Sequence, residues 1–445
     1  MLKPARAAAN WCGMSSSCAV RGSSRFEDYC VQLGSVLGHL DRVAPLRAYL
    51  AGLLLPGERK SVEPMAAKID PQHVGARHQS MHHFVATAPW DERALLEAAR
   101  EYALSGLERH APVAAWVVDD TGLPKKGTAS VGVARQYCGP KGKTDNCQVA
   151  VMVSVCNATM SVPCCWRLYL PEEWAQDKQR REAAFVPVEL KFATKWQIAL
   201  QEIEGLLEAD LPRAPVIADA GYGAATEFRD GLRERGLLYA VGVLPDTSVW
   251  PQGQHPLPPR AKPRTGRPPT NLRRDAQHQP SAVKELALAL PKQAWKMVRW
   301  REGTKGKMES RFACVRVRPA HRDYKRQVPR EEEWLVIEWP TSEREPTKYT
   351  LSSLPRSATP EDLVRLIKLR WRVERDYQEL KDELGIDHFE GRGWRGFHHH
   401  GALCIAAYAF LVAERARLSP PAPLAFLKAA RVPKGFRARG SPDAA

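Results

Sequence analysis

Apolar side chains recur at every third or fourth position through much of the first hundred residues. From residue 26 to residue 55 this spacing predicts helices, which a polar break at residues 57–61 separates from a further helix. Asp91 stands before an Ala- and Leu-rich run and predicts the N-cap of another helix. The pattern indicates a helical N-terminal domain over residues 24–110. Residues 1–23 show no periodicity and are expected to form a disordered leader.

A different pattern begins at residue 114. The run 114–118 is apolar and of strand length, and it ends in two adjacent carboxylates, Asp119 and Asp120, before a turn at Gly122. Because successive side chains of a strand point to opposite faces, only one of the two can face a given side. Two carboxylates at the end of a core strand need a cation, a basic partner or solvent. The alternative is an ordinary strand end that runs into an Asp-containing turn.

Two more apolar runs, at residues 130–137 and 148–155, predict an antiparallel meander with the first strand. Charged and periodic segments then predict helices over residues 172–182 and 192–207.

The motif of a strand that ends in a carboxylate occurs a second time. The short apolar run 214–218 ends in Asp219, and a Gly-containing turn leads into a predicted helix over residues 226–235. In open α/β sheets the chemistry lies at the carboxyl ends of the strands, so Asp219 is a candidate site residue. An ordinary helix cap is the alternative.

A Pro-rich stretch at residues 251–280 follows the strand at 239–243. Such a stretch cannot build a core and is either a linker or a nucleic-acid-binding arm, and its residues 265–269 resemble the core of a minor-groove AT-hook. Six basic residues stand in it without an acidic residue between them: Arg260, Lys262, Arg264, Arg267, Arg273 and Arg274. Strand-like runs beyond it predict a β-rich insertion, at residues 297–300, 312–317, 334–339 and 349–352.

The pattern from residue 359 to residue 384 predicts one continuous helix. Its polar residues Arg370, Glu374, Tyr377 and Lys381 are spaced by four, three and four, which puts all of them on one helical face. A solvated ladder of charges is the alternative.

Asp119, Asp219 and Glu374 supply three carboxylates from two strands and one helix. Such a set suits a two-metal site for phosphoryl transfer, in which Mg²⁺ or Mn²⁺ matches the all-oxygen ligands.

The last periodic segment predicts a helix around residues 402–417. His398, His399 and His400 precede it, and because consecutive side chains point in different directions we expect them at the surface.

The feature of the composition that says most about the partner of the chain is its charge. The 445 residues contain 66 Lys and Arg against 50 Asp and Glu, a net charge of +16 that favours a polyanionic partner such as nucleic acid. The ten cysteines form no Cys-x-x-Cys pair, which argues against zinc modules and disulfide scaffolds and favours a reducing cytoplasm. No run reaches the ~20 apolar residues of a membrane span, so we expect a soluble protein without a membrane partner.

The segment Arg370-Trp371-Arg372-Val373-Glu374, followed by Lys381, is similar to the Tyr-x-x-Arg-x-x-x-Glu-x-x-x-x-x-x-Lys signature of bacterial insertion-sequence transposases of the DDE superfamily. Ile367 stands at the Tyr position of that signature. The blocks around Asp119 and Asp219 look like the first and second Asp blocks of one subgroup, and the resemblance extends over about residues 53–411.

The resemblance implies an α+β multidomain protein with an RNase H-like α/β catalytic core. The expected core occupies residues 111–236 and 356–395, interrupted by the β-rich insertion 237–355 with its basic loop 251–280. The helical domain 24–110 is expected to bind DNA, although a purely structural bundle is an equal alternative, and residues 396–445 form a C-terminal helix and tail.

The resemblance also implies cleavage at terminal inverted repeats, followed by attack of the freed 3′-hydroxyl on target DNA. Asp119, Asp219 and Glu374 would bind Mg²⁺ or Mn²⁺, with Asp119 favoured over Asp120. The residues expected to contact DNA are Arg370, Lys381, Lys125, Lys126, Arg260, Lys262, Arg264 and Arg267. A nucleoid-associated, cytoplasmic homodimer on DNA is the expected assembly. The alternatives are a non-catalytic DNA-binding derivative and a metal-dependent nuclease without strand transfer.

Overall fold

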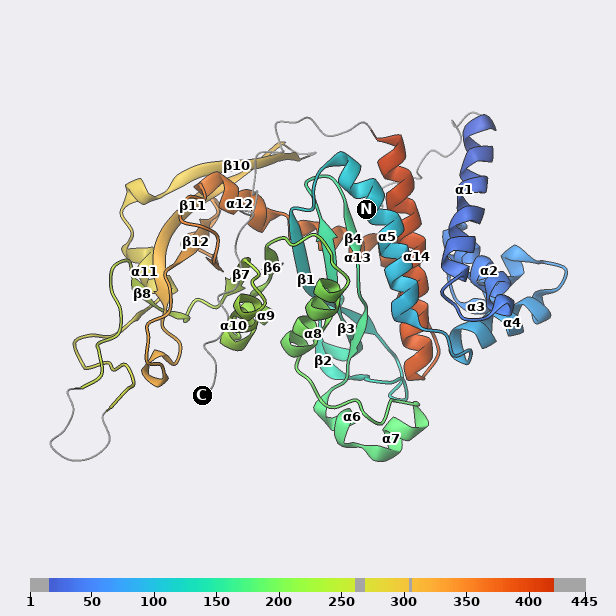
Figure 1. The fold of residues 1–445 in the computed structure, drawn as a ribbon, viewed down its shortest axis with the longest axis horizontal. Helices are drawn as coiled ribbons and strands as arrows, with labels where there is room; N and C mark the ends of the chain where they lie inside the picture. The colour runs from blue at the N-terminus through green and yellow to red at the C-terminus, as the bar shows by residue number, and fades with distance from the viewer. Residues whose placement is uncertain (1–15, 261–268, 304–305, 420–445) are drawn as a thin grey trace, which may run out of the picture.

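Long runs of buried apolar residues pair as strands at the centre of the structure (Figure 1). The computed structural model describes residues 16–260, 269–303 and 306–419. The first seven strands are β1 (Ala115–Pro124), β2 (Ala134–Cys138), β3 (Lys143–Cys156), β4 (Ser161–Pro163), β5 (Arg167–Tyr169), β6 (Val216–Ala218) and β7 (Tyr239–Val243). Strand β1 lies between β3, to which it is antiparallel, and β6, to which it is parallel, and β6 continues in parallel to β7.

Two predictions about these strands are wrong. Strand β1 does not end at the carboxylates but pairs with β3 from Ala115 to Pro124, because β3 is long enough to supply partners throughout. Asp119 and Asp120 therefore lie in mid-strand. The meander is also wrong: β3 lies between β1 and β2, since the β2–β3 hairpin folds back and β3 takes β1 as its second neighbour.

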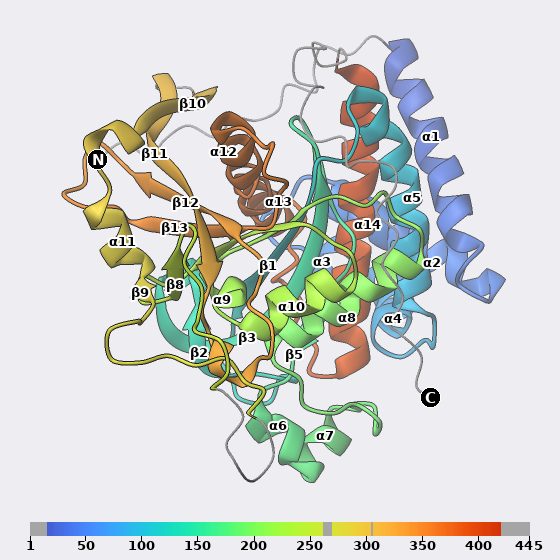
Figure 2. The same cartoon turned by 60° about the vertical axis from the view of Figure 1, so that its left-hand side comes forward.

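Helices cover both faces of these strands. Figure 2 shows α8 and α10 on one face and α14 behind the other. The helices between β5 and β7 are α6 (Glu172–Gln176), α7 (Lys178–Ala183), α8 (Lys195–Glu208), α9 (Ala220–Gly223) and α10 (Thr226–Glu234). The single helix predicted over 172–182 is thus two, because the Asp177 carboxylate accepts a hydrogen bond from the backbone of Arg180 and begins a new helix.

The segment predicted as an insertion extends the same sheet. Its elements are β8 (Ser248–Pro251), β9 (Ser281–Ala282), α11 (Val283–Ala289), β10 (Lys296–Gly303), β11 (Gly306–Pro319), β12 (Glu333–Trp339) and β13 (Lys348–Ser352). Strand β7 also lies within the predicted limits 237–355 and pairs with β6 on one side and β13 on the other, so the sheet runs without interruption from the core into the insertion. Arg260 is exposed, whereas Lys262, Arg264, Arg267 and most of the AT-hook-like segment lie outside the described residues. The mixed α/β architecture is confirmed, and the domain limits stay predictions.

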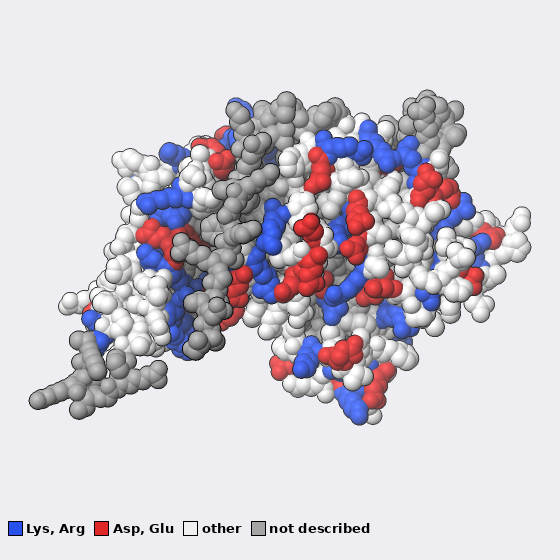
Figure 3. All heavy atoms as spheres, in the orientation of Figure 1, with Lys and Arg blue, Asp and Glu red and all other residues white. Residues whose placement is uncertain are grey.

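Charges of both signs alternate over the face shown in Figure 3, where Lys and Arg side chains stand among Asp and Glu. The net charge of +16 is therefore not gathered into one continuous basic surface on this face.

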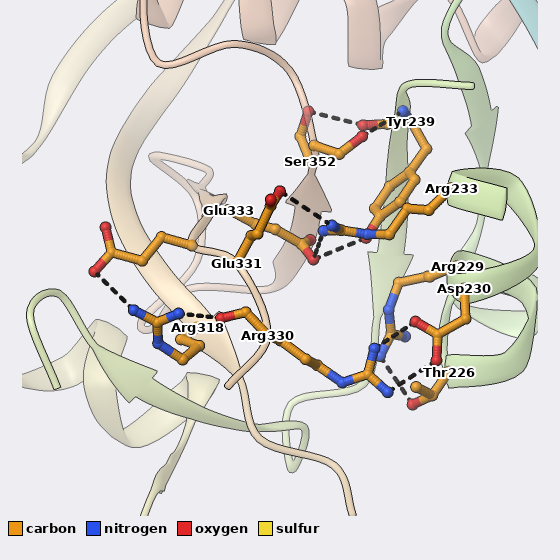
Figure 4. A network of polar contacts seen from close by, with 12 residues as sticks. Thr226, Arg229, Asp230, Arg233, Tyr239, Arg318, Arg330, Glu331, Glu333 and Ser352 are labelled. Carbon is orange, nitrogen blue, oxygen red and sulfur yellow. Dashed lines mark hydrogen bonds and ion pairs between the residues drawn. The ribbon is translucent and has the colours of Figure 1, made fainter. Parts of the chain in front are cut away.

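A network of ion pairs fixes α10 to the insertion (Figure 4). Arg233 pairs with the buried Glu333, which also accepts a hydrogen bond of 2.8 Å from the Tyr239 hydroxyl. Arg330 pairs with Asp230 through Nη2 and Oδ2 at 2.8 Å. Because α10 follows Asp219 in the chain, this network also holds the segment that carries that carboxylate.

The N-terminal region is helical, as predicted. Its helices are α1 (Ser16–Gly34), α2 (Val43–Leu54), α3 (Val62–Ile69), α4 (Val74–Ala86) and α5 (Glu92–His110), and the Asp91 side chain caps α5 as expected. Residues 16–23 belong to α1 and not to a disordered leader, while residues 1–15 lie outside the described part. No helix in the described ranges combines the length and apolar character of a membrane span.

Helix α14 (Trp394–Leu418) begins eight residues before the predicted start and is buried on nearly all sides. The surface prediction for the three histidines is wrong, since each imidazole points to a different buried partner. His400 Nδ1 lies 2.9 Å from the Tyr49 hydroxyl, the His399 ring stacks on Trp90, and His398 Nε2 accepts from the backbone of Leu168. Burial lowers the pKa of all three, to about 3 for His398 and about 4 for the other two.

Close packing against α14 gives a prediction about stability. A Cβ atom at Gly401 would lie 2.2 Å from Nε1 of the buried Trp166, whereas one at Gly205 in α8 would meet nothing within 4 Å. Gly401→Ala should lower the free energy of unfolding by about 1–3 kcal/mol through overpacking. Gly205→Ala should raise it by about 0.5–1 kcal/mol, the usual helical preference for Ala. Urea denaturation measures both, and equal stability of the two variants would contradict the packing described.

Candidate active site

The helix predicted over 359–384 is interrupted just before its charged face. Helix α12 (Pro360–Lys368) and helix α13 (Trp371–Asp382) are separated at Leu369 and Arg370. The backbone N–H groups of Arg370 and Arg372 bond to carbonyls three residues back, so the chain tightens locally between the two helices. The prediction of one helix is wrong, but Glu374 and Lys381 remain on α13 and Arg370 precedes its first turn.

Two of the predicted carboxylates lie side by side in the sheet. The parallel pairing of β1 with β6 places Val118 opposite Ala218, so Asp119 in β1 lies beside Asp219, the residue directly after β6. Asp219 also caps α9, because its Oδ1 accepts a 2.9 Å hydrogen bond from the backbone N–H of Gly221. The functional and the capping interpretations of Asp219 are therefore compatible.

Arg370 connects this strand pair to α13. Its Nη1 donates to Asp119 Oδ2 at 2.9 Å and its Nη2 donates to Glu374 Oε1 at 3.0 Å. Asp219 lies close enough to strengthen the charged form of Arg370 electrostatically. The three carboxylates and the arginine that the sequence singled out thus occupy one region of the molecule.

Burial dominates the electrostatics of Asp119. Desolvation raises the pKa of this carboxyl from its ordinary 3.8 to about 7; Arg370 opposes the rise, and the nearby charges of Asp219 and Asp120 add to it. A partly buried group of carboxylates with one arginine has a deficit of positive charge, which a cation would offset.

Comparison with known proteins identifies the family of the chain. A family model described as DDE superfamily endonuclease matches residues 32–307, more than half of the 445 residues. The chain belongs to the DDE superfamily of endonucleases. The matched region includes Asp119 and Asp219 and ends before Glu374. The resemblance inferred from the motifs is confirmed at this level.

One curated relative of this DDE-superfamily chain is named "Probable transposase for insertion sequence element IS701", from Microchaete diplosiphon. The two are 31% identical over 219 residues, which are 49% of this chain and 53% of the relative. The chain spans about half the length of this relative.

The donor chemistry of the candidate site fits a hard divalent cation, since all three candidate ligands are carboxylates. Within the described ranges, no three His, Cys, Asp or Glu side chains are already gathered closely enough to hold an ion. Arg370 lies between Asp119 and Glu374, and the Glu374 side chain is 61% exposed. Glu374 is thus linked to Asp119 through Arg370 and is open to solvent.

Asp120 points away from this group, to the opposite face of β1. Its Oδ2 accepts from Lys195 Nζ at 2.9 Å and its Oδ1 accepts from the Tyr222 hydroxyl at 3.2 Å. The sequence did not indicate Lys195 or Tyr222 as partners of Asp120, because they lie 75 and 102 residues from it in the chain and no local pattern relates them. The structure thus separates the two adjacent aspartates as the alternation of strand faces predicts.

The lysines expected to bind DNA differ in their surroundings. Lys381 Nζ donates to Thr121 Oγ1 at 2.6 Å and to Gly122 O at 3.2 Å, so it rests on β1 beside the carboxylates. Lys125 Nζ donates to Phe389 O at 2.7 Å, whereas Lys126 is exposed. Burial lowers the pKa of Lys381 and of Lys125.

Tyr377 lies between Glu374 and Lys381 on α13, and its buried hydroxyl has no hydrogen-bond partner among the described residues.

Proposed function

We propose that this chain is a DNA transposase, which cleaves DNA at terminal inverted repeats and joins the freed 3′-hydroxyl ends to target DNA. The observation that carries the proposal is the meeting of Asp119, on β1, and Asp219, directly after β6, with the Arg370–Glu374 ion pair at the start of α13. An RNase H-like core with a β-rich insertion accommodates this arrangement. The printed name of the relative, a probable transposase, supports the same class.

Asp119, Asp219 and Glu374 would hold Mg²⁺ or Mn²⁺. When bound, such cations supply Lewis acidity and offset the charge that develops at the transferring phosphate. With the carboxylates engaged, the Arg370 guanidinium is free to pair with a DNA phosphate, a ligand that suits its planar fork. Lys381 lies one helical turn beyond Tyr377 and adds a second positive charge on the same side of β1.

The net charge of +16 supports DNA as the partner, because lysine and arginine side chains release counterions when they neutralise phosphates. Lys126 and Arg260 are exposed and available for such contacts. Lys262, Arg264 and Arg267 are proposed as further contacts, and a homodimer would place two such sites on a pair of transposon ends.

A joining assay tests the proposal. The purified chain is incubated with Mg²⁺, a plasmid that carries its reading frame with the native flanking DNA, and a circular target plasmid. We expect flank–target junctions that sequencing detects and that Glu374→Gln does not produce. Cleaved flanks without any junctions would identify a nuclease that lacks strand transfer. Binding of the flanks without cleavage would identify a non-catalytic DNA-binding protein.

A further inference from the structure

Both carboxylate oxygens of Asp120 accept hydrogen bonds, on the face of β1 opposite Arg370. The donors are Lys195, the first residue of α8, and Tyr222, which lies within α9, the short helix that Asp219 caps. The Asp120 side chain is 24% exposed and that of Lys195 34%, so the contact is partly shielded from solvent. One carboxylate thus ties β1 to two helices that belong to different parts of the chain.

Tyr222 relates Asp120 to the candidate metal ligands. Its ring is buried and its hydroxyl donates to Asp120 Oδ1. Burial raises the pKa of this phenol, and the charges of Asp120, Tyr377, Asp119 and Asp219 raise it further. The hydrogen bond to Asp120 and the place of Tyr222 in α9, which Asp219 caps, put it beside both aspartates. Tyr222 is therefore neutral and acts as a hydrogen-bond donor.

The backbone around Asp219 leaves the paired strands at this point. Pairing of β1 with β6 ends at Val118 and Ala218, and the chain then turns into α9. On one side α9 lies against β7, where a Cβ at Gly223 would come 2.0 Å from Gly242 O. The hydrogen bond from Tyr222 to Asp120 holds the same turn toward β1.

We propose that Asp120 is a positioning residue, which acts through Tyr222 and Lys195 to fix the separation of Asp119 and Asp219 for a divalent cation. The inference rests on the proposed function, because it assigns these two aspartates to one metal site. It predicts that Asp120 does not bind the cation itself. Loss of such supporting contacts usually weakens metal binding by about 10–100-fold without abolishing it.

Calorimetric titration of the full-length chain with Mn²⁺ tests this assignment. We expect the dissociation constant to rise roughly 10-fold in Tyr222→Phe and in Asp120→Asn. The double variant should bind no more weakly than the worse single variant, since the Tyr222 contact that Tyr222→Phe removes is one of the two that Asp120→Asn weakens. Tyr137→Phe, an exposed tyrosine on β2, is the matched control and should bind as the wild type does. Thermal unfolding of each variant shows that the fold is retained.

Three results would overturn the assignment. Loss of all Mn²⁺ binding in Asp120→Asn, with Tyr222→Phe unaffected, would make Asp120 a direct ligand. Unchanged binding in both variants would leave the contact a purely structural one. Absence of Mn²⁺ binding by the wild type would remove the metal site and the inference with it. Mn²⁺ binding as predicted, but no cleavage of DNA by the wild type, would overturn the proposed function alone.

Discussion

Asp119→Asn is expected to make the chain more stable at pH 8 while it abolishes metal-dependent DNA cleavage. Desolvation raises the pKa of this carboxyl from 3.8 to about 7, so the folded chain holds a proton between these values that the unfolded chain has released. The free energy of unfolding therefore falls as pH rises from about 4 to about 7. Above pH 7 the full free-energy cost of burying the charged carboxylate is present. Asparagine carries no charge and removes this cost.

The gain in stability should be on the order of 4 kcal/mol, because the pKa rises from 3.8 to about 7 and a change of one in pKa is worth about 1.4 kcal/mol. The attraction of Arg370 is already contained in that pKa. Thermal unfolding in the presence of a chelator, at pH 4 and pH 8, measures the effect. The difference in the free energy of unfolding between Asp119→Asn and the wild type should be absent at pH 4 and present at pH 8. Asp376, whose pKa burial raises to about 6, is common to both proteins and cancels in the comparison.

The rate of DNA cleavage by Asp119→Asn should fall, although its stability rises. Cation binding supplies several kcal/mol of transition-state stabilisation, and each ~1.4 kcal/mol is a factor of ten in rate, so loss of a ligand should cost on the order of 10³-fold. Asp382→Asn is the matched control, because Asp382 is exposed on α13. A variant at Asp119 that is less stable at pH 8, or that cleaves DNA at the wild-type rate, would contradict the role given to this carboxylate.

Much of the site could be predicted because its signals are local. Alternation along a strand separated Asp119 from Asp120, and helical spacing placed Glu374 and Lys381 on one face. The short strand before Asp219 was equally clear, since an apolar run, a carboxylate and a Gly-containing turn follow one another directly. Each of these arguments needs only neighbouring residues.

The wrong predictions concern contacts between distant segments. The length of β1 depends on pairing with β3, and the burial of His398, His399 and His400 depends on helices that surround α14. Likewise, the partners of Asp120 come from residues 195 and 222, which only the folded sheet brings near it. Tertiary packing determines these features, and no local sequence pattern indicates them.

The central claim is that Asp119, Asp219 and Glu374 act together on DNA through a divalent cation. The most direct test compares Mg²⁺-dependent cleavage of the native flanking DNA by wild type, Asp219→Ala and Glu374→Ala. Two exposed carboxylates provide matched controls, Asp246→Ala after β7 and Asp382→Ala on α13. We predict that both site variants lose cleavage by on the order of 10³-fold while both controls retain it. Undiminished cleavage by either Asp219→Ala or Glu374→Ala would contradict the three-carboxylate site.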